Sequence, residues 1–170
     1  GAPEQYLTGK AWFMDALFHV GPGVLIPRPD SEILVAEALA RESLRSPRGH
    51  TLSFADICTG SGCIGLSIAL ALDRSGTAYT GLLTDCSAAA LDYAAYNFRH
   101  LSPQGAVRVA LCDLFPDPDG TFDLIVSNPP YIPSADIPGL MPEVAMHEPG
   151  IALDGGADGL NLIRKILKEA

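Results

Sequence analysis

An apolar segment with the pattern of a strand is followed by four residues rich in hydrogen-bond acceptors, Asn128-Pro129-Pro130-Tyr131. The two prolines fix the backbone and have no N–H, so the carbonyl groups around them remain available as acceptors. Asn128 adds a side-chain carbonyl, and Tyr131 adds a flat aromatic face. Such a corner can hold a planar NH2 group between two acceptors and the ring. The simpler interpretation is a rigid turn at the end of a strand.

Three carboxylates close three successive predicted strands. They are Asp56, Asp85 and Asp113. The carboxyl ends of parallel strands share one rim, so we expect these side chains to face the same ligand. Neither Lys nor Arg occurs between His50 and Leu72, which favours a ligand with positive charge or hydroxyl donors. Taken singly, each Asp could instead cap a neighbouring helix or turn.

A glycine-rich loop, Thr59-Gly60-Ser61-Gly62, follows the first of these strands. It lets the backbone approach a ligand closely and presents N–H groups at the start of a helix. Residues 60–65 also match the G-x-G-x-x-G pattern of dinucleotide-binding proteins, with Asp85 at the expected distance of about 20 residues. An NAD-dependent oxidoreductase is therefore one interpretation. A carboxylate at Asp56 would repel a pyrophosphate but could pair with the ammonium group of S-adenosylmethionine, which favours the latter cofactor.

Strands and helices alternate around these residues. We expect strands at 52–57, 78–84, 107–111 and 122–126, and helices from Asp30 or Ser31 to about Leu44, from Cys63 to Leu72, from the N-cap Ser87 to Leu101, and from Leu160 onwards. Residues 1–23 are expected to be irregular or strand-like, and residues 129–159 to form a long loop. This order predicts an α/β fold with a mostly parallel, twisted sheet and ligands beyond the carboxyl ends of the strands.

The composition fits one folded domain. The chain has 170 residues, of which 48% are hydrophobic and 18% are charged. Its formal net charge of −9 argues against direct binding to nucleic acid, which depends on clustered Lys and Arg. No apolar stretch approaches the roughly 20 residues needed to span a bilayer, so we expect no membrane association. We expect a monomer in the cytoplasm.

Four cysteines occur without a C-x-x-C pair, namely Cys58, Cys63, Cys86 and Cys112. Three of them lie near the same strand ends and could in principle meet around zinc. Without a paired spacing, reduced and mostly buried thiols are the better interpretation, and we expect no metal. The four histidines are scattered along the chain, which favours surface or loop positions.

Several of these segments together resemble the S-adenosylmethionine-dependent protein-(glutamine-N5) methyltransferases. The similar stretches are Gln5-Tyr6, Val24-Leu25-Ile26-Pro27-Arg28-Pro29, residues 56–62, residues 127–132, Glu148-Pro149 and the glycine-rich segment at 152–160. The last of these points to the enzymes that modify the glutamine of the Gly-Gly-Gln loop in peptide chain release factors. The resemblance implies a Rossmann-like class I methyltransferase fold.

The resemblance also implies a domain division. Residues 1–30 would lead into an S-adenosylmethionine-binding domain at residues 31–170. Members of the family carry an additional N-terminal helical domain and further strands after the last helix, so we expect this chain to be an incomplete piece that lacks the C-terminal strands. Four predicted strands would make a thin sheet, which agrees with that expectation.

Cofactor-binding residues follow by position in the family's motifs. The methionine part of the cofactor would lie against the loop after Asp56, formed by Cys58, Thr59, Gly60, Ser61 and Gly62. Asp85 would accept hydrogen bonds from the ribose hydroxyls, and Asp113 with Leu114 would flank the adenine. Asp56 and Asn128 would also belong to the cofactor site. The product would be S-adenosylhomocysteine.

Substrate-binding residues come from the corner at the last strand. Asn128 and the carbonyl of Pro129 would hold the glutamine amide, with Pro130 completing the corner and Tyr131 packing beside it. The chain departs from the common family pattern at Cys58, where many members have glycine, at Asp30-Ser31 and at Cys86. We assign no role to Arg28, although it belongs to a matching motif.

Hydrogen bonds from the amide to this corner would raise electron density on its nitrogen and aim it at the sulfonium methyl, without a strong base or a metal. Other substrates remain open. They are a glutamine in a ribosomal protein and the exocyclic NH2 of adenine (N6) or cytosine (N4) in nucleic acid. A binding module that has lost activity would be expected to show damage at Asn128 or Tyr131, and both are present.

Overall fold

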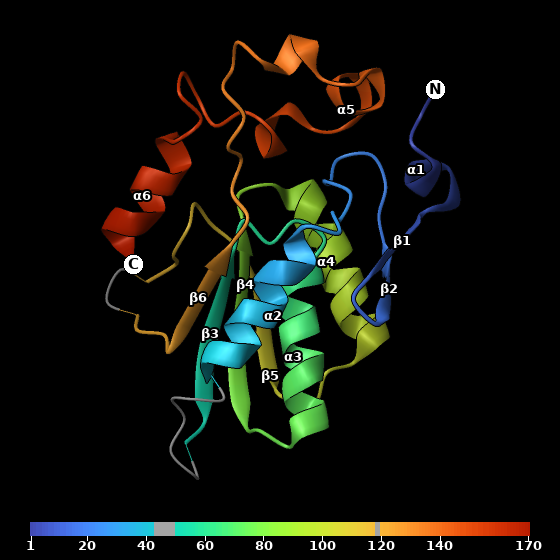
Figure 1. Ribbon diagram of the computed structural model, residues 1–170. Coiled ribbons are helices and arrows are strands. Elements are labelled where there is room, and N and C mark those ends of the chain that lie inside the picture. Colours follow the sequence, from blue (N-terminus) through green and yellow to red (C-terminus); the bar gives the residue numbers. More distant parts are fainter. Residues whose placement is uncertain (43–49, 118–119) are drawn as a thin grey trace.

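The computed structural model describes residues 1–42, 50–117 and 120–170. Its centre is a parallel sheet with the strand order β5-β4-β3-β6 (Figure 1). The strands are β3 (Leu52–Ile57), β4 (Tyr79–Asp85), β5 (Ala106–Leu111) and β6 (Leu124–Ser127). The predicted parallel α/β fold is confirmed. The register aligns the strand ends, because Ile57 pairs with Thr84 on one side and with Ser127 on the other.

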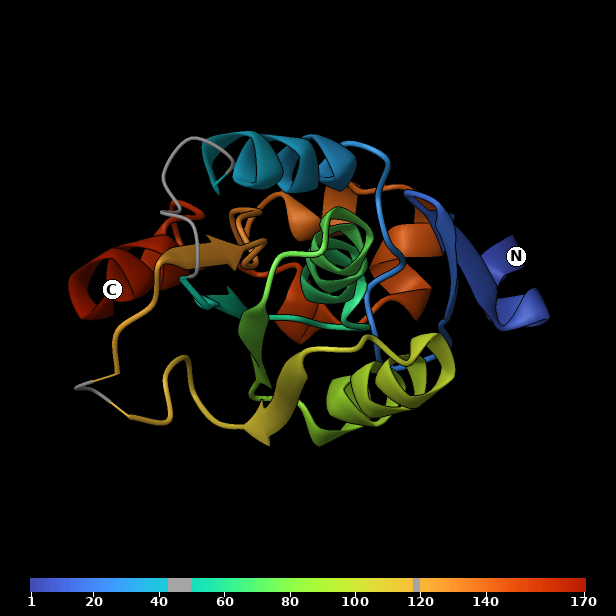
Figure 2. The same ribbon diagram turned by 90° about the horizontal axis from the view of Figure 1, so that it is seen from below.

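Helices cover the two faces of the sheet unequally. Helices α2 (Ser31–Glu42), α3 (Cys63–Ser75) and α4 (Ala88–Leu101) lie on one face. Helix α6 (Asn161–Glu169) lies on the opposite side of the sheet from α3 (Figure 2). The alternation along β3 explains this arrangement, because Phe54 packs into the cluster beneath α3 while Ala55 and Ile57 pack towards α6.

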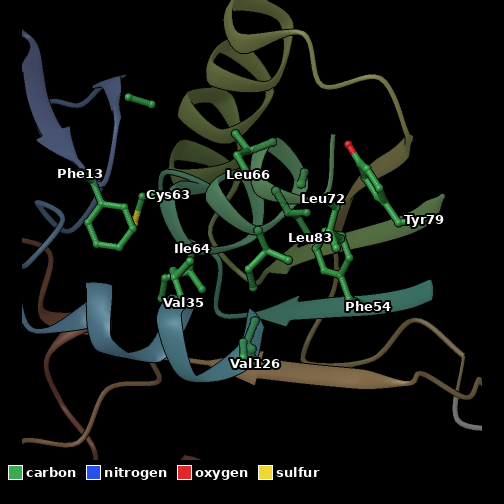
Figure 3. Packing of buried hydrophobic residues seen from close by; sticks show 14 of the residues in the cluster. Phe13, Val35, Phe54, Cys63, Ile64, Leu66, Leu72, Tyr79, Leu83 and Val126 are labelled. Carbon is green, nitrogen blue, oxygen red and sulfur yellow. The ribbon is translucent and has the colours of Figure 1, made fainter. Parts of the chain in front are cut away.

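The main core lies between the sheet and α3 (Figure 3). Leu66 and Ile68 of α3 are fully buried, as is Leu83 of β4. The sequence of α3 is apolar on almost every side, which suits a helix enclosed between α2, α4 and the sheet. The helix continues to Ser75 rather than ending at Leu72, because Gly76 provides the left-handed C-cap at φ +70°.

Helix boundaries elsewhere follow local capping. The Ser87 side chain accepts a hydrogen bond from the Ala90 N–H, so the predicted N-cap of α4 is confirmed. Helix α2 begins at Ser31 as expected, but the predicted end near Leu44 lies outside the described residues. Strand β6 begins at Leu124, two residues later than predicted.

The N-terminal segment is more regular than the sequence indicated. It contains a short helix α1 (Glu4–Thr8) and an antiparallel hairpin of β1 (Lys10–Phe13) and β2 (Ala16–His19). The strand-like expectation is confirmed for the hairpin, whereas α1 was missed. Asn97 of α4 is fully buried and bonds the backbone N–H and C=O of His19 and the carbonyl of Ser61. It therefore ties the hairpin to the glycine-rich loop.

The segment 129–159 arches over the carboxyl ends of the strands (Figure 1). It is not a structureless loop, because it contains η1 (Ile137–Gly139), α5 (Pro142–His147) and η2 (Gly150–Ala152). These short helices do not extend over enough residues to give a periodic sequence signal. Within the described ranges, the helices lack the length and apolar character that crossing a membrane requires.

Candidate functional site

Two neighbouring cavities open at the carboxyl ends of the strands. The larger has a volume of about 650 Å³ and the smaller of about 400 Å³. The walls that both cavities share are formed by Leu25, Arg28, Ser31, Asn128 and Ala152. Both volumes fall within the usual range for small-molecule sites. The site is therefore a pair of cavities that meet at Asn128.

The glycine-rich loop forms one wall of the larger cavity. The lining includes Cys58, Thr59, Gly60 and Ser61, while Gly62 lies just behind as the N-cap of α3. The loop curls tightly because Cys58, Gly60 and Gly62 all have positive φ angles of 59°, 57° and 82°. Glycine adopts this conformation without steric cost, whereas Cys58 adopts it with strain.

Asp85 braces this loop from the neighbouring strand. Its Oδ2 accepts the Gly60 N–H at 2.9 Å, and its Oδ1 accepts the Ser87 N–H at 2.9 Å. Each carboxylate oxygen has a further lone pair, so Asp85 can still accept hydrogen bonds from a ligand in the larger cavity. This position agrees with its expected role towards two hydroxyl groups.

Asp56 does not line either cavity, contrary to the expectation that it would face the ligand. It is fully buried behind the loop, where its Oδ2 accepts hydrogen bonds from the Thr59 hydroxyl at 2.6 Å and the Gly65 N–H at 2.9 Å. Its Oδ1 has no hydrogen-bond partner among the described residues. Burial raises the pKa of Asp56 to about 7 despite these two bonds. Asp56 thus supports the glycine-rich loop from behind.

The expected adenine-flanking residues are also placed differently. Asp113 is exposed and forms an ion pair with Lys165 of α6, whereas Leu114 is buried. Neither lines the larger cavity, whose nearby wall is formed by Cys86 and Lys165. The carbonyl of Leu114 is already bonded by the Thr84 hydroxyl at 2.8 Å, which turns this residue into the core.

The corner after β6 faces both cavities. Asn128 and Pro130 line the larger one, and Asn128, Pro129 and Tyr131 line the smaller one. The Asn128 Nδ2 donates a long hydrogen bond of 3.4 Å to the Ser31 hydroxyl, which leaves its Oδ1 as the acceptor. Tyr131 is 59% exposed, so its ring is accessible to a ligand that enters from solvent. The predicted acceptor corner, residues 128–131, therefore lies where the two cavities join.

The glycine-rich segment at 152–160 packs against this corner and holds it in place. The Ile132 N–H donates to the Leu153 carbonyl at 3.0 Å, and the Gly155 N–H donates to the Ile132 carbonyl at 2.9 Å. Gly159 lies directly against the Tyr131 carbonyl, where a side chain would not fit. Resemblance to the family pointed to this segment, but only the structure shows what it contacts.

One ion pair at the site was not anticipated. The Arg28 Nη2 donates to Glu148 Oε1 at 2.6 Å, across 120 positions of the sequence. The Glu148 side chain is almost fully buried, and the Arg28 side chain is about one third exposed. Both residues stand in motifs that resemble the family, yet no spacing rule links such distant positions.

The cysteines are all free thiols, and Cys58, Cys63 and Cys86 line the larger cavity. Burial raises the pKa of Cys58 and of Cys63 to about 12, so both carry their proton at neutral pH. No group of three or more His, Cys, Asp or Glu side chains in the described part of the chain is arranged to hold a metal ion.

Solved structures share this fold at low sequence identity. The hMettl16 catalytic domain, solved in complex with MAT2A 3'UTR hairpin 6, matches 89% of this chain and 56% of its own with a TM-score of 0.58 at 16% identity. The SAM-dependent methyltransferase from Agrobacterium tumefaciens matches 71% of this chain and 39% of its own with a TM-score of 0.51 at 18% identity. These matches confirm the Rossmann-like methyltransferase fold.

Relatives of closer sequence carry the name release factor glutamine methyltransferase. The protein from Gloeobacter violaceus is 44% identical over 99% of this chain and 56% of its own length, and that from Thermodesulfovibrio yellowstonii is 41% identical over 99% and 58%. The chain thus spans little more than half the length of these relatives. Residues 31–141 match the family described as "Methyltransferase small domain". Because this match covers more than half of the chain, the chain belongs to the methyltransferase small domain family.

Proposed function

We propose that this chain is the catalytic part of an S-adenosylmethionine-dependent enzyme that methylates the side-chain amide nitrogen of a glutamine in a peptide chain release factor. The observation that carries the proposal is the junction of two cavities at Asn128. The larger cavity suits the methyl donor, and the smaller cavity suits the amide. The names of the relatives support the release factor as the substrate.

The residues of the larger cavity fit this cofactor. The loop at 58–62 supplies backbone groups at the N-terminus of α3, and Asp85 supplies acceptors for hydroxyl groups. The lining is otherwise largely apolar, as expected for a site that encloses a nucleoside. When bound, S-adenosylmethionine supplies a methyl group activated by its positively charged sulfur.

The amide nitrogen is a poor nucleophile because its lone pair is delocalised into the carbonyl group. Hydrogen bonds from its two N–H groups to Asn128 Oδ1 and the Pro129 carbonyl would raise the electron density on nitrogen and fix its direction. Tyr131, at the mouth of the smaller cavity, would pack against the amide plane. The methylated nitrogen is acidic enough to release its proton to water afterwards, so positioning is the main contribution of the chain.

Transfer of labelled methyl groups tests this proposal. The protein is incubated with labelled S-adenosylmethionine and either a release factor, its Gln→Ala variant at the Gly-Gly-Gln loop, a ribosomal protein mixture or duplex DNA. We expect label on the release factor alone, and loss of the label with the Gln→Ala variant. Label that persists in that variant, or that appears on DNA, would contradict the proposal.

An Asn128→Ala variant links the transfer to the corner. Removal of one preorganised hydrogen-bond partner typically lowers kcat by about 10²-fold to 10³-fold. Calorimetric binding of S-adenosylhomocysteine should weaken by a smaller factor than kcat falls, because Asn128 is one of several residues that line the larger cavity and the loop and Asp85 remain. The domain division at residue 30 and a monomeric state remain predictions that gel filtration and limited proteolysis can test.

A further inference from the structure

Positive charge in the larger cavity comes from two of its lining residues, Arg28 and Lys165. Lys165 is paired with Asp113 and lies near Cys86, which directly follows Asp85. This places Lys165 at the end of the cavity where hydroxyl groups are expected to bind. Arg28 instead lines both cavities together with Ser31 and Asn128. The two cations therefore have different neighbours in the cavity lining: Lys165 lies near Cys86, whereas Arg28 bonds through its backbone to Ser31, which in turn bonds Asn128.

Arg28 is held firmly in place. Its backbone lies between Pro27 and Pro29, whose rings restrict the chain, and its carbonyl accepts the Ser31 N–H at 3.0 Å. Its Nη2 is fixed by the buried Glu148 carboxylate at 2.6 Å. A guanidinium group has five N–H donors, so this single bond leaves others for a second acceptor. Because the Arg28 side chain is about one third exposed, those donors can reach the cavity.

The proposed cofactor has one carboxylate, in its amino-acid part, at the end remote from the adenine. The loop at 58–62, against which that part would lie, contains no cationic side chain. A carboxylate buried beside this loop needs a charged or strongly donating partner. We propose that Arg28, anchored by Glu148, binds the carboxylate of the methionine part of the cofactor. This inference rests on the proposed function.

Paired ligands test the assignment by calorimetry. S-adenosylhomocysteine carries the carboxylate, whereas 5′-methylthioadenosine shares the nucleoside and the sulfur but lacks the amino-acid part. An Arg28→Gln change should weaken binding of S-adenosylhomocysteine by roughly 10-fold to 100-fold, the usual cost of a lost charge-assisted hydrogen bond. Binding of 5′-methylthioadenosine should stay within about twofold of the unmodified protein, since it makes no carboxylate contact.

Removal of Arg28 alone leaves Glu148 buried without its partner, which would destabilise the fold. The double variant R28Q/E148Q avoids this, because both groups become neutral and can still form a hydrogen bond. It should show the same selective loss for S-adenosylhomocysteine. Arg28→Lys, which keeps the charge but not the fork of donors, should show a smaller loss. Arg99→Gln is the matched control, because Arg99 is exposed and lines neither cavity.

The outcomes distinguish a failure of the Arg28 assignment from a failure of the proposed function. Equal losses for both ligands in the double variant would show that Arg28 acts only through the fold, and unchanged binding of S-adenosylhomocysteine would show that it makes no contact. Either result overturns the assignment of Arg28 while leaving the methyltransferase proposal intact. If the unmodified protein binds neither nucleoside, the proposed function fails and this inference fails with it.

Discussion

Gly159 packs directly against the carbonyl oxygen of Tyr131, leaving no space for even a methyl side chain at position 159. Gly159 also has a φ of +76°, a conformation that other residues adopt only with strain. The glycine-rich segment and the acceptor corner are thus in backbone-to-backbone contact. A shift of one must move the other.

A Gly159→Ala variant should therefore displace the corner and impair methyl transfer. Catalysis that depends on positioning is sensitive to small displacements, and we expect kcat to fall by about 10-fold to 100-fold. Steady-state kinetics with the glutamine substrate measures this. Gly139→Ala is the control, because a Cβ there would meet no atom within 4 Å. Equal kcat values for the two variants would contradict the positioning role of Gly159.

Asp85 joins the glycine-rich loop to the start of α4, and both of its oxygens face backbone donors. An Asp85→Asn change removes the charge and turns one acceptor into a donor. Binding of S-adenosylhomocysteine should weaken by roughly 10-fold to 100-fold, as measured by calorimetry. Asp92→Asn, at an exposed position of α4, should leave the affinity unchanged. A normal affinity in the Asp85 variant would exclude it from the ligand site.

Asp56 makes the stability depend on pH. Burial raises its pKa from 3.8 to about 7, so between about pH 4 and pH 7 the folded chain holds a proton that the unfolded chain has released. The resulting stability is fully present below pH 4 and is lost as the pH rises through 7. The free energy of unfolding of the native protein should therefore decline across this window.

An Asp56→Asn variant lacks this titration and resembles the protonated form. Chemical denaturation from pH 4 to pH 8 should show that its stability relative to the native protein increases with pH, by an amount on the order of a few kcal/mol. Parallel stability curves for the two proteins would show that Asp56 ionises normally in the folded chain.

Cys58 occupies a left-handed conformation at φ +59°. A protein with glycine at a given position is ordinarily less stable than the same protein with alanine there. The order should reverse where φ is positive. We expect Cys58→Gly to unfold with a free energy about 1 kcal/mol greater than Cys58→Ala, since both remove the sulfur and only alanine retains the strain. Thermal denaturation of the pair measures the difference. If Cys58→Ala were more stable than Cys58→Gly, the backbone at position 58 would not be strained.

Local sequence signals predicted most of the fold. Strand β3 has the boundaries that its apolar run indicated, and the Ser87 cap starts α4. Short elements without periodicity, such as α1 and α5, escaped because five or six residues do not define a hydrophobic face. The end of α3 was placed early because polar residues at 73–75 conceal the true stop at Gly76.

The site was predictable in part. The loop residues from Cys58 to Ser61, Asp85 and Asn128 line the cavities as expected. Asp56 failed that expectation because the sequence shows that a strand ends in a carboxylate but not which face it occupies or how deeply it is buried. The Arg28–Glu148 pair could not be foreseen, since its partners meet only when residues 129–159 fold back over the sheet.

The position of S-adenosylhomocysteine in a crystal structure of the complex decides whether the two cavities serve one reaction. We expect the nucleoside to occupy the larger cavity near Asp85 and the sulfur to face the junction with the smaller cavity at Asn128. A nucleoside bound elsewhere, or a sulfur directed away from Asn128, would contradict it, because the activated methyl could then not reach an amide held at the corner.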